Sequence, residues 1–334
     1  MKHNINLIVV ALAASFLWSG CNKAGKLSQQ SLEKTPPTGP VQLVQKWTDG
    51  EQIVKHIDMK INMVINVPNQ PNPVNQDVTL TEKYGLAVSK PDSSGGKVEM
   101  EFLSLRMDSI QGGQTNFSYD SDVKGGAPKD RASAAIAKGL EGIIGVKLDF
   151  FLNATNGVDR IEGVDTMMNR LSSGAMNNSG VKNMFNKSTL EQMIGESQYL
   201  PAQPVQPGDK WPIQTQMDLD EMGSLTVSNT ITFVQWEKHG PRLCARLEFD
   251  GTYQGKPGKN PNPTGMSMTI QDGTTSGVSW FDPELGRIID SDVNHDLTMS
   301  ITISMPAKGG GKPTPQTMKM AMHQVLNVKL DSVK

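Results

Sequence analysis

The sequence predicts a mainly β fold, a β-rich α+β protein in which an antiparallel, curved sheet or half-barrel carries a helical insert. Three observations predict this class. Apolar and polar residues alternate in long segments, loops rich in Pro, Gly and Asn separate these segments, and helical spacing of apolar residues occurs near the middle of the chain. Alternation with a period of two gives a strand one buried and one wet face, which is typical of antiparallel sheets. A two-sheet β-sandwich is the alternative.

The first β half is expected over residues 43–160. Its first strand has an apolar side chain at alternate positions, namely Ile57, Met59, Ile61, Met63, Ile65 and Val67. A Pro- and Asn-rich loop over 68–75 ends this strand. The apolar phase changes after Phe102 in the segment 98–107, which indicates a β-bulge or a sharp bend. Residues 146–152 alternate again and predict another strand.

The helical insert is expected over residues 128–144 and 164–199. In the first part, Ala132, Ile136 and Leu140 recur at helical spacing. In the second part, Ser188 and Glu191 have the form of a capping box, in which the serine precedes the helix and the glutamate lies in its first turn.

The second β half is expected over residues 200–334. Period-two alternation recurs over four segments, which are 225–233, 243–249, 297–305 and 318–330. Loops over 255–265 and 306–315 separate consecutive strands, and the segment Asp282–Gly286 has the composition of a hairpin turn. Residues 43–334 are therefore expected to form a single β-rich domain.

Residues 1–20 have the order of a secretory signal peptide. Lys2 is followed by an apolar run over 7–17 and by the small residues Ser19 and Gly20. The apolar run is too short to span a bilayer as a helix. Cys21 follows the small pair directly, so the segment resembles the bacterial lipoprotein signal.

That resemblance implies that Cys21 is acylated, with palmitate among its modifications, and becomes the mature N-terminus of a lipoprotein. Residues 21–42 would then form the acylated end and a flexible tether, because the segment is polar and has no hydrophobic period. Asn22 after the cysteine favours the outer membrane of the bacterial cell envelope, facing the periplasm or the surface. Trp18 stands where the signal usually has leucine, so ordinary cleavage with a free thiol at Cys21, or an uncleaved anchor, are the alternatives.

A short motif lies at the start of the second β half. Residues 204–211 read P-V-Q-P-G-D-K-W and resemble the P-V-x-P-G-D-x-W signature of an uncharacterised family of bacterial exported lipoproteins. The resemblance brings no assigned activity. Physically, Pro207 and Gly208 fit a type II turn, since proline presets its φ and glycine accepts a positive φ. Trp211 would then enter the next strand as a core anchor.

Composition and motifs exclude several function classes. The 32 basic and 34 acidic residues are mixed and give a net charge of −2, so no nucleic-acid surface is expected. The sequence has neither a zinc-type histidine motif nor a P-loop, a nucleotide-binding glycine motif or a nucleophile elbow. We therefore expect no enzyme, no metal site and no cofactor. Cys244 is expected to be structural although Arg242 and Arg246 share its face, and Asp290 and Asp292 are interpreted as solvated strand-end residues.

Two functions remain open at this point. The first is a non-catalytic binding module for a lipid or other apolar ligand, because methionine is common at 19 residues and adapts to irregular ligands. Its apolar face would include Met59, Met63, Met299, Met320 and Met322. A curved sheet of this kind is similar to the periplasmic lipoprotein-carrier fold. The second is a structural or protein-interaction lipoprotein that has a fully packed core and an envelope protein as its partner.

Overall fold

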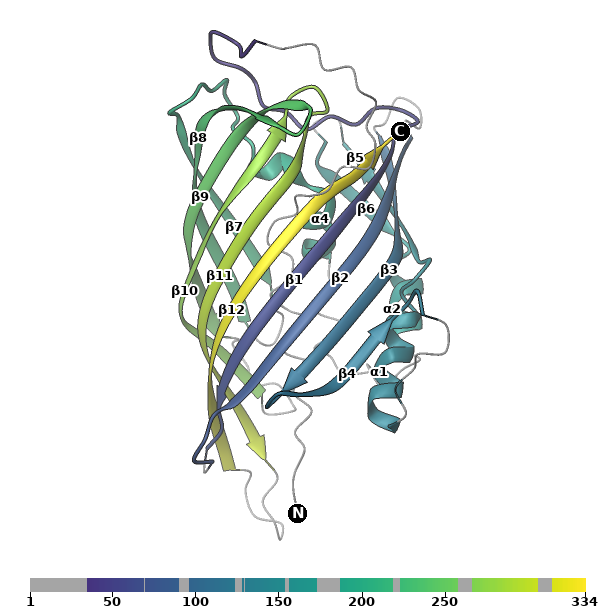
Figure 1. Cartoon of the computed structure of the whole chain (residues 1–334), viewed down its shortest axis with the longest axis vertical. Helices are drawn as coiled ribbons and strands as arrows, with labels where there is room; N and C mark the ends of the chain where they lie inside the picture. The colour runs from purple at the N-terminus through teal and green to yellow at the C-terminus, as the bar shows by residue number, and fades with distance from the viewer. Residues whose placement is uncertain are drawn as a thin grey trace.

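Twelve tilted strands, five to twenty residues long, dominate the computed structural model (Figure 1). The structure describes residues 35–68, 70–89, 96–123, 128, 130–153, 156–172, 187–218, 223–257, 266–305 and 314–334. The strands are β1 (Gln52–Asn66), β2 (Val74–Ser89), β3 (Lys97–Gln111), β4 (Gln114–Asp120), β5 (Lys147–Leu152), β6 (Val158–Glu162), β7 (Lys210–Asp218), β8 (Gly223–His239), β9 (Arg242–Pro257), β10 (Met266–Asp282), β11 (Arg287–Met305) and β12 (Thr314–Val333).

All twelve strands belong to one open, curved antiparallel sheet, which is not closed into a barrel. Its order is β6-β5-β3-β2-β1-β12-β11-β10-β9-β8-β7, and β4 pairs with the other half of β3. This confirms the predicted fold class and sets aside the two-sheet sandwich. The strands after the helical insert form an unbroken run of hairpins from β7 to β12.

The first and last strands of the sheet meet at its centre. β1 pairs with β12 along almost its whole length, for example Ile57 with Val328 and Met63 with Met322. On its other side β12 pairs with β11, so the C-terminal strand joins the two predicted β halves into one sheet. We call this β1–β12 pairing the central seam.

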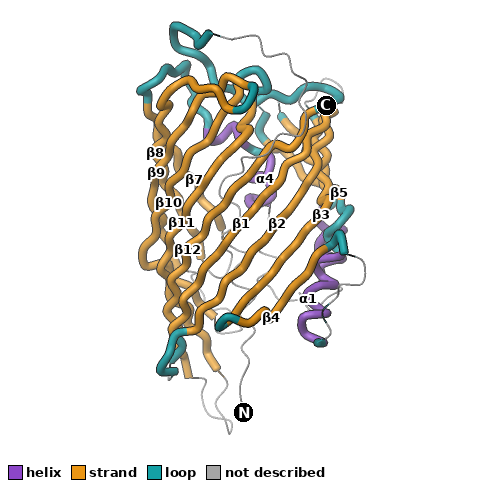
Figure 2. The backbone as a smooth tube through the Cα atoms, viewed as in Figure 1, coloured by secondary structure: helices purple, strands orange, loops and turns teal. Residues whose placement is uncertain are grey.

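The helices lie at two places. Helix α1 (Arg131–Glu141) and helix α2 (Val164–Ser172) pack together beside β4 at one edge, while α4 (Lys187–Ile194) lies on the concave side of the sheet (Figures 1 and 2). The short 3₁₀ turn η2 (Glu196–Tyr199) follows α4. Glu196 accepts a 2.5 Å hydrogen bond from buried Lys55 of β1 and another, at 2.8 Å, from the backbone N–H of Ile288 in β11. Two strands therefore hold the end of the insert against the sheet.

The structure can be compared with the sequence expectation at four local features. The predicted bulge is present, since the β2–β3 register shifts between Lys83 and Tyr84, opposite exposed Leu103.

Strand β9 continues through Gly255 to Pro257, where the sequence predicts a loop. β2 is not among the predicted strands, because Gln76 and Glu82 stand at buried positions and interrupt its apolar alternation. Helix α4 begins at Lys187, so Ser188 lies inside the helix and does not precede it.

Candidate functional site

The five methionines predicted to share an apolar face all lie on the concave face of the sheet. Met63 pairs with Met322, and Met299 pairs with Met320. Met59 lies further along β1 and pairs with Leu326. Each of the five is 2–5 % exposed. The two methionine pairs thus form a continuous patch across β1, β12 and β11, and Met59 extends it toward the end occupied by α4.

Polar side chains interrupt this apolar face at one level. On β10, Thr275 pairs with His295 of β11, and His295 pairs in turn with Gln324 of β12. All three side chains are buried. Asn229 of β8 lies on the same line, because it pairs with Gly251, which in turn pairs with Thr275. We call Asn229, Thr275, His295 and Gln324 the polar row. Gln324 breaks the apolar alternation of β12 in the sequence, which was a signal that the row exists.

A buried tyrosine holds the histidine of the polar row. The hydroxyl of Tyr253 on β9 lies 2.6 Å from Nδ1 of His295, and the two rings meet edge to face. Burial lowers the pKa of His295 to about 4, so the imidazole is neutral at physiological pH. Burial also raises the pKa of the Tyr253 hydroxyl, which therefore stays protonated. This part of the concave face is polar but carries no charge.

Charged groups on the concave face lie nearer the end at which η2 is attached. Lys55 and Glu196 form the buried ion pair described above. Glu82 of β2 is also buried, and desolvation raises the pKa of its carboxyl to about 7. Glu82 pairs with Ile57, and Gln324 of the polar row with Ile61, so the two polar residues stand at different levels of the sheet.

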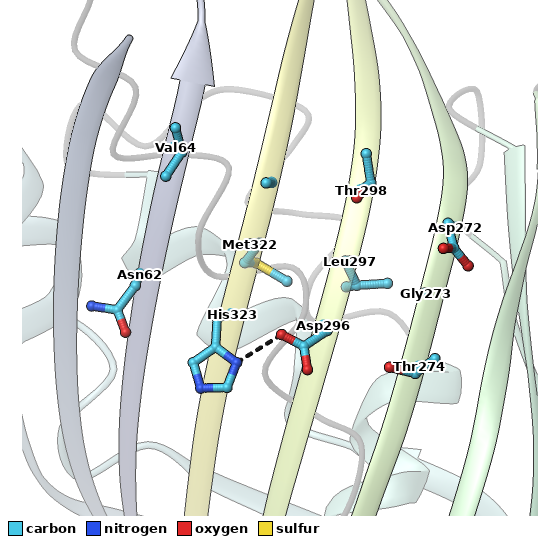
Figure 3. A pocket seen from close by; sticks show the side chains of 11 residues that line it. Asn62, Val64, Asp272, Gly273, Thr274, Asp296, Leu297, Thr298, Met322 and His323 are labelled. Carbon is cyan, nitrogen blue, oxygen red and sulfur yellow. Dashed lines mark hydrogen bonds and ion pairs between the residues drawn. The ribbon is translucent and has the colours of Figure 1, made fainter.

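A depression of about 280 Å³ opens on the outer face of the sheet (Figure 3). Exposed His323 and Asp296 face each other there, with 2.8 Å between Nδ1 and Oδ1. Asn62, Asp272 and Thr298 also line it, and Met322 is the member of the predicted methionine set that reaches it. The surface of the depression is more apolar than polar, and the hydrogen bond between His323 and Asp296 is made within the protein.

A second polar cluster lies on the outer face of β8–β11. His239 stacks on Trp280 with 4.4 Å between ring centroids, and its Nε2 lies 2.7 Å from Oδ2 of Asp290. Asp290 is 2 % exposed, so its interpretation as a solvated strand-end residue is wrong: the histidine and the tryptophan cover it. Burial raises the pKa of Asp290.

Cys244 is buried on this same outer face. Burial, and the nearby carboxylate of Asp282, raise the pKa of its thiol, while Arg242 opposes them. Arg242 is itself engaged, since its Nη1 donates a 2.6 Å hydrogen bond to Asp282. The thiolate required for nucleophilic chemistry is therefore disfavoured at this position.

The motif over 204–211 forms a turn that leads into β7. Gly208 has φ +99°, and the backbone N–H of Asp209 donates a 3.0 Å hydrogen bond to the carbonyl of Gln206, across Pro207. Trp211 is 9 % exposed, and its indole N–H donates to the carbonyl of Tyr199 at the end of η2. The motif thus attaches the helical insert to the second β half. Cys21, the predicted acylation site, lies outside the described residues.

In the described part of the chain, no three His, Cys, Asp or Glu side chains gather closely enough to hold a metal ion. Among its helices, none is both long enough and apolar enough to cross a membrane.

Comparison with known proteins gives a family and distant similarities in shape. Residues 95–288 match the model of a family described as a family of unknown function (DUF6263). No curated protein matches the sequence significantly.

Among solved structures, lipovitellin, studied for its lipid–protein interactions, is similar with a TM-score of 0.40 and 8% identity over 86% of this chain. The chain spans 26% of the lipovitellin chain. A protein described as exported, with a YmcC-like fold, from Bacteroides fragilis NCTC 9343 has a TM-score of 0.26 and 11% identity, with 88% of this chain and 100% of that chain covered. An outer membrane channel from Pseudomonas putida F1 has a TM-score of 0.25 and 5% identity, with the same coverage of 88% and 100%.

Proposed function

The chain belongs to the DUF6263 family of unknown function, whose model covers more than half of it, and from that starting point we propose that it is a non-catalytic binding module for a lipid or other apolar ligand. The observation that carries the proposal is the open, curved sheet with a methionine-rich concave face. A concave surface with adaptable apolar side chains suits irregular hydrocarbon ligands.

The proposal includes the location of the protein. The signal-like segment over 1–20 and Cys21 support a bacterial envelope lipoprotein, anchored to the membrane through acyl chains on that cysteine. More than one chain is needed for stable attachment, and an acylated N-terminal cysteine supplies several. A binding module anchored in this way would meet apolar ligands where they leave or enter a bilayer.

One observation favours the second candidate, a structural or protein-interaction lipoprotein. The five methionines are only 2–5 % exposed, as expected for side chains that are entirely core. In that case the concave face needs no ligand, and the function would lie on the outer face toward an envelope protein.

A substitution that over-packs the concave face would distinguish the two candidate functions. The full-length protein would be purified from membranes into nanodiscs, and the molecules bound to it identified by mass spectrometry against empty nanodiscs. The variant Met63→Trp would be compared with Val64→Trp, whose side chain projects from the outer face of the same strand and is 41 % exposed.

A near-stoichiometric apolar molecule is expected with the wild type and with Val64→Trp, and its loss is expected with Met63→Trp, because the larger side chain fills the space of the ligand. Absence of any enriched molecule from all three proteins would contradict a ligand-binding function and support the packed-core candidate.

A further inference from the structure

The polar row lies between two apolar levels of the concave face. On one side the aligned residues include Val227, Leu297 and Met322, and on the other side they include Ile231, Val293 and Leu326. A line of polar groups therefore runs across β8–β12, with Gly251 at its level on β9, and apolar residues flank it on both sides along the strands. Nothing in the architecture of an antiparallel sheet requires polar side chains at this level.

Four polar atoms of this row have no hydrogen-bond partner among the residues that the structure describes. They are Oδ1 of Asn229, Nε2 of His295, and both Nε2 and Oε1 of Gln324. His295 is 1 % and Gln324 0 % exposed. A buried polar group without a partner destabilises the folded state, so such groups in a folded protein need a counterpart.

The hydrogen-bonding character of these atoms follows from their neighbours. Either atom can donate in the hydrogen bond between the Tyr253 hydroxyl and Nδ1 of His295, so Nε2 of His295 is a donor in one tautomer of the ring and an acceptor in the other. The Gln324 amide offers both a donor and an acceptor, and Oδ1 of Asn229 offers an acceptor. The polar row thus presents both kinds of partner within one buried line.

The absence of charged side chains beside the polar row limits which polar groups of a ligand could bind there. No Lys, Arg, Asp or Glu stands in the polar row, or at the two concave-face levels of β8–β12 that directly flank it. An ionised headgroup at this level would be desolvated without a counter-charge, which is strongly unfavourable. A carboxamide fits, because it is uncharged and combines a donor with an acceptor.

We propose that the polar row binds the amide group of a long-chain lipid amide, while the hydrocarbon chain of that ligand lies along the methionine patch. This inference rests on the proposed function and specifies the ligand class of the same concave face. Gln324 and the amide would form reciprocal hydrogen bonds, and Nε2 of His295 would hydrogen-bond to the amide oxygen or to the amide N–H, according to the tautomer of the ring.

Photo-crosslinking of the full-length protein in phosphatidylcholine nanodiscs tests this. Two probes of sixteen carbons would carry the same diazirine in the chain, one ending in a primary amide and the other in a trimethylammonium group. The variants are Gln324→Met, which removes the polar atoms at similar length, and Leu326→Met, an apolar change two residues away on the same face of β12. His295→Gln serves as a second variant of the row.

The wild type and Leu326→Met are expected to crosslink the amide at least tenfold more efficiently than the cation, at residues of the concave face. Gln324→Met is expected to lose most of that preference while still crosslinking both probes. An equal yield for both probes in the wild type, or a preference unchanged in both Gln324→Met and His295→Gln, would overturn the lipid-amide assignment but leave apolar binding intact. Failure of both probes to label the concave face in any of the proteins would overturn the proposed function as well.

Discussion

His295 couples the stability of the protein to pH. Its pKa is about 4 in the folded protein against 6.5 for an ordinary histidine, because burial disfavours the charged ring. Between pH 4 and pH 6.5, His295 is therefore mostly protonated in the unfolded chain but mostly neutral in the folded protein. The stabilising contribution is fully present above pH 6.5 and is lost as the pH falls toward 4.

We expect His295→Gln to remove most of this acid sensitivity. The loss attributable to the wild-type histidine between pH 6.5 and 4 should be on the order of 3 kcal/mol in the free energy of unfolding. Chemical denaturation at a series of pH values would measure it, with His323→Gln, on the exposed outer face of β12, as the matched control. Equal acid sensitivity in His295→Gln and the wild type would contradict this account.

At the scale of single residues, the sequence indicates which face a side chain occupies better than it indicates its partners. The alternation of β1, β11 and β12 places all five methionines on one face, and the structure agrees. The burial of Asp290 could not be predicted, because it depends on His239 and Trp280, which come from other strands. The link between Tyr253 and His295 joins residues 42 positions apart for the same reason.

At the scale of elements, glycines on the concave face allow large side chains of neighbouring strands to cover β9 and β10. Gly277 is the clearest case, because a Cβ there would lie 2.3 Å from the carbonyl oxygen of Asp292 and 2.4 Å from the ring of Phe249. The aromatic ring therefore occupies the place of the missing side chain. Such a position tolerates glycine alone without movement of the neighbouring strand.

We expect Gly277→Ala to lower the free energy of unfolding by about 1–3 kcal/mol, the usual cost of over-packing a close contact. Gly39→Ala is the matched control, because a Cβ at that position meets no atom within 4 Å. Thermal and urea denaturation of both variants would measure the difference. A Gly277→Ala protein as stable as Gly39→Ala would show that β10 and β11 move apart easily.

The same glycines explain why the strands are longer than the sequence predicts. Gly255 has the composition signal of a loop, yet it lies within β9, where a Cβ would come 2.9 Å from Cβ of Ile270. Glycine therefore marks a close approach between strands here and not a turn. At Gly286 and Gly208, by contrast, the residues have φ +63° and +99°, and the sequence locates both turns.

At the scale of the whole molecule, the central seam decides whether there is one sheet or two. β1–β3 and β7–β11 are each held by their own hairpins and ladders, but β12 alone joins them through its pairing with β1 and β11. No local pattern encodes this pairing. The alternation predicts each strand of the seam, whereas the neighbours of a strand depend on contacts between distant parts of the chain.

We expect Ala321→Pro to disrupt the sheet, because Ala321 lies on the exposed outer face of β12 between Val64 and Thr298, and proline removes a ladder hydrogen bond in a central strand. The expected loss is about 3 kcal/mol or more. Gln214→Pro is the control, since β7 is an edge strand that already contains Pro212. Hydrogen exchange should show β1–β3 and β8–β11 losing protection together in Ala321→Pro. Retained protection in both halves would contradict a joining role for β12.

The central seam also has a consequence for the synthesis of the protein. β12 follows every other strand of the sheet in the chain, and until it is synthesised β1 and β11 each present an unpaired edge. A chain cut before β12 would hold all the other strands of the sheet and still expose both edges to proteases and chaperones. Only a chain that includes β12 can cover these edges within the sheet.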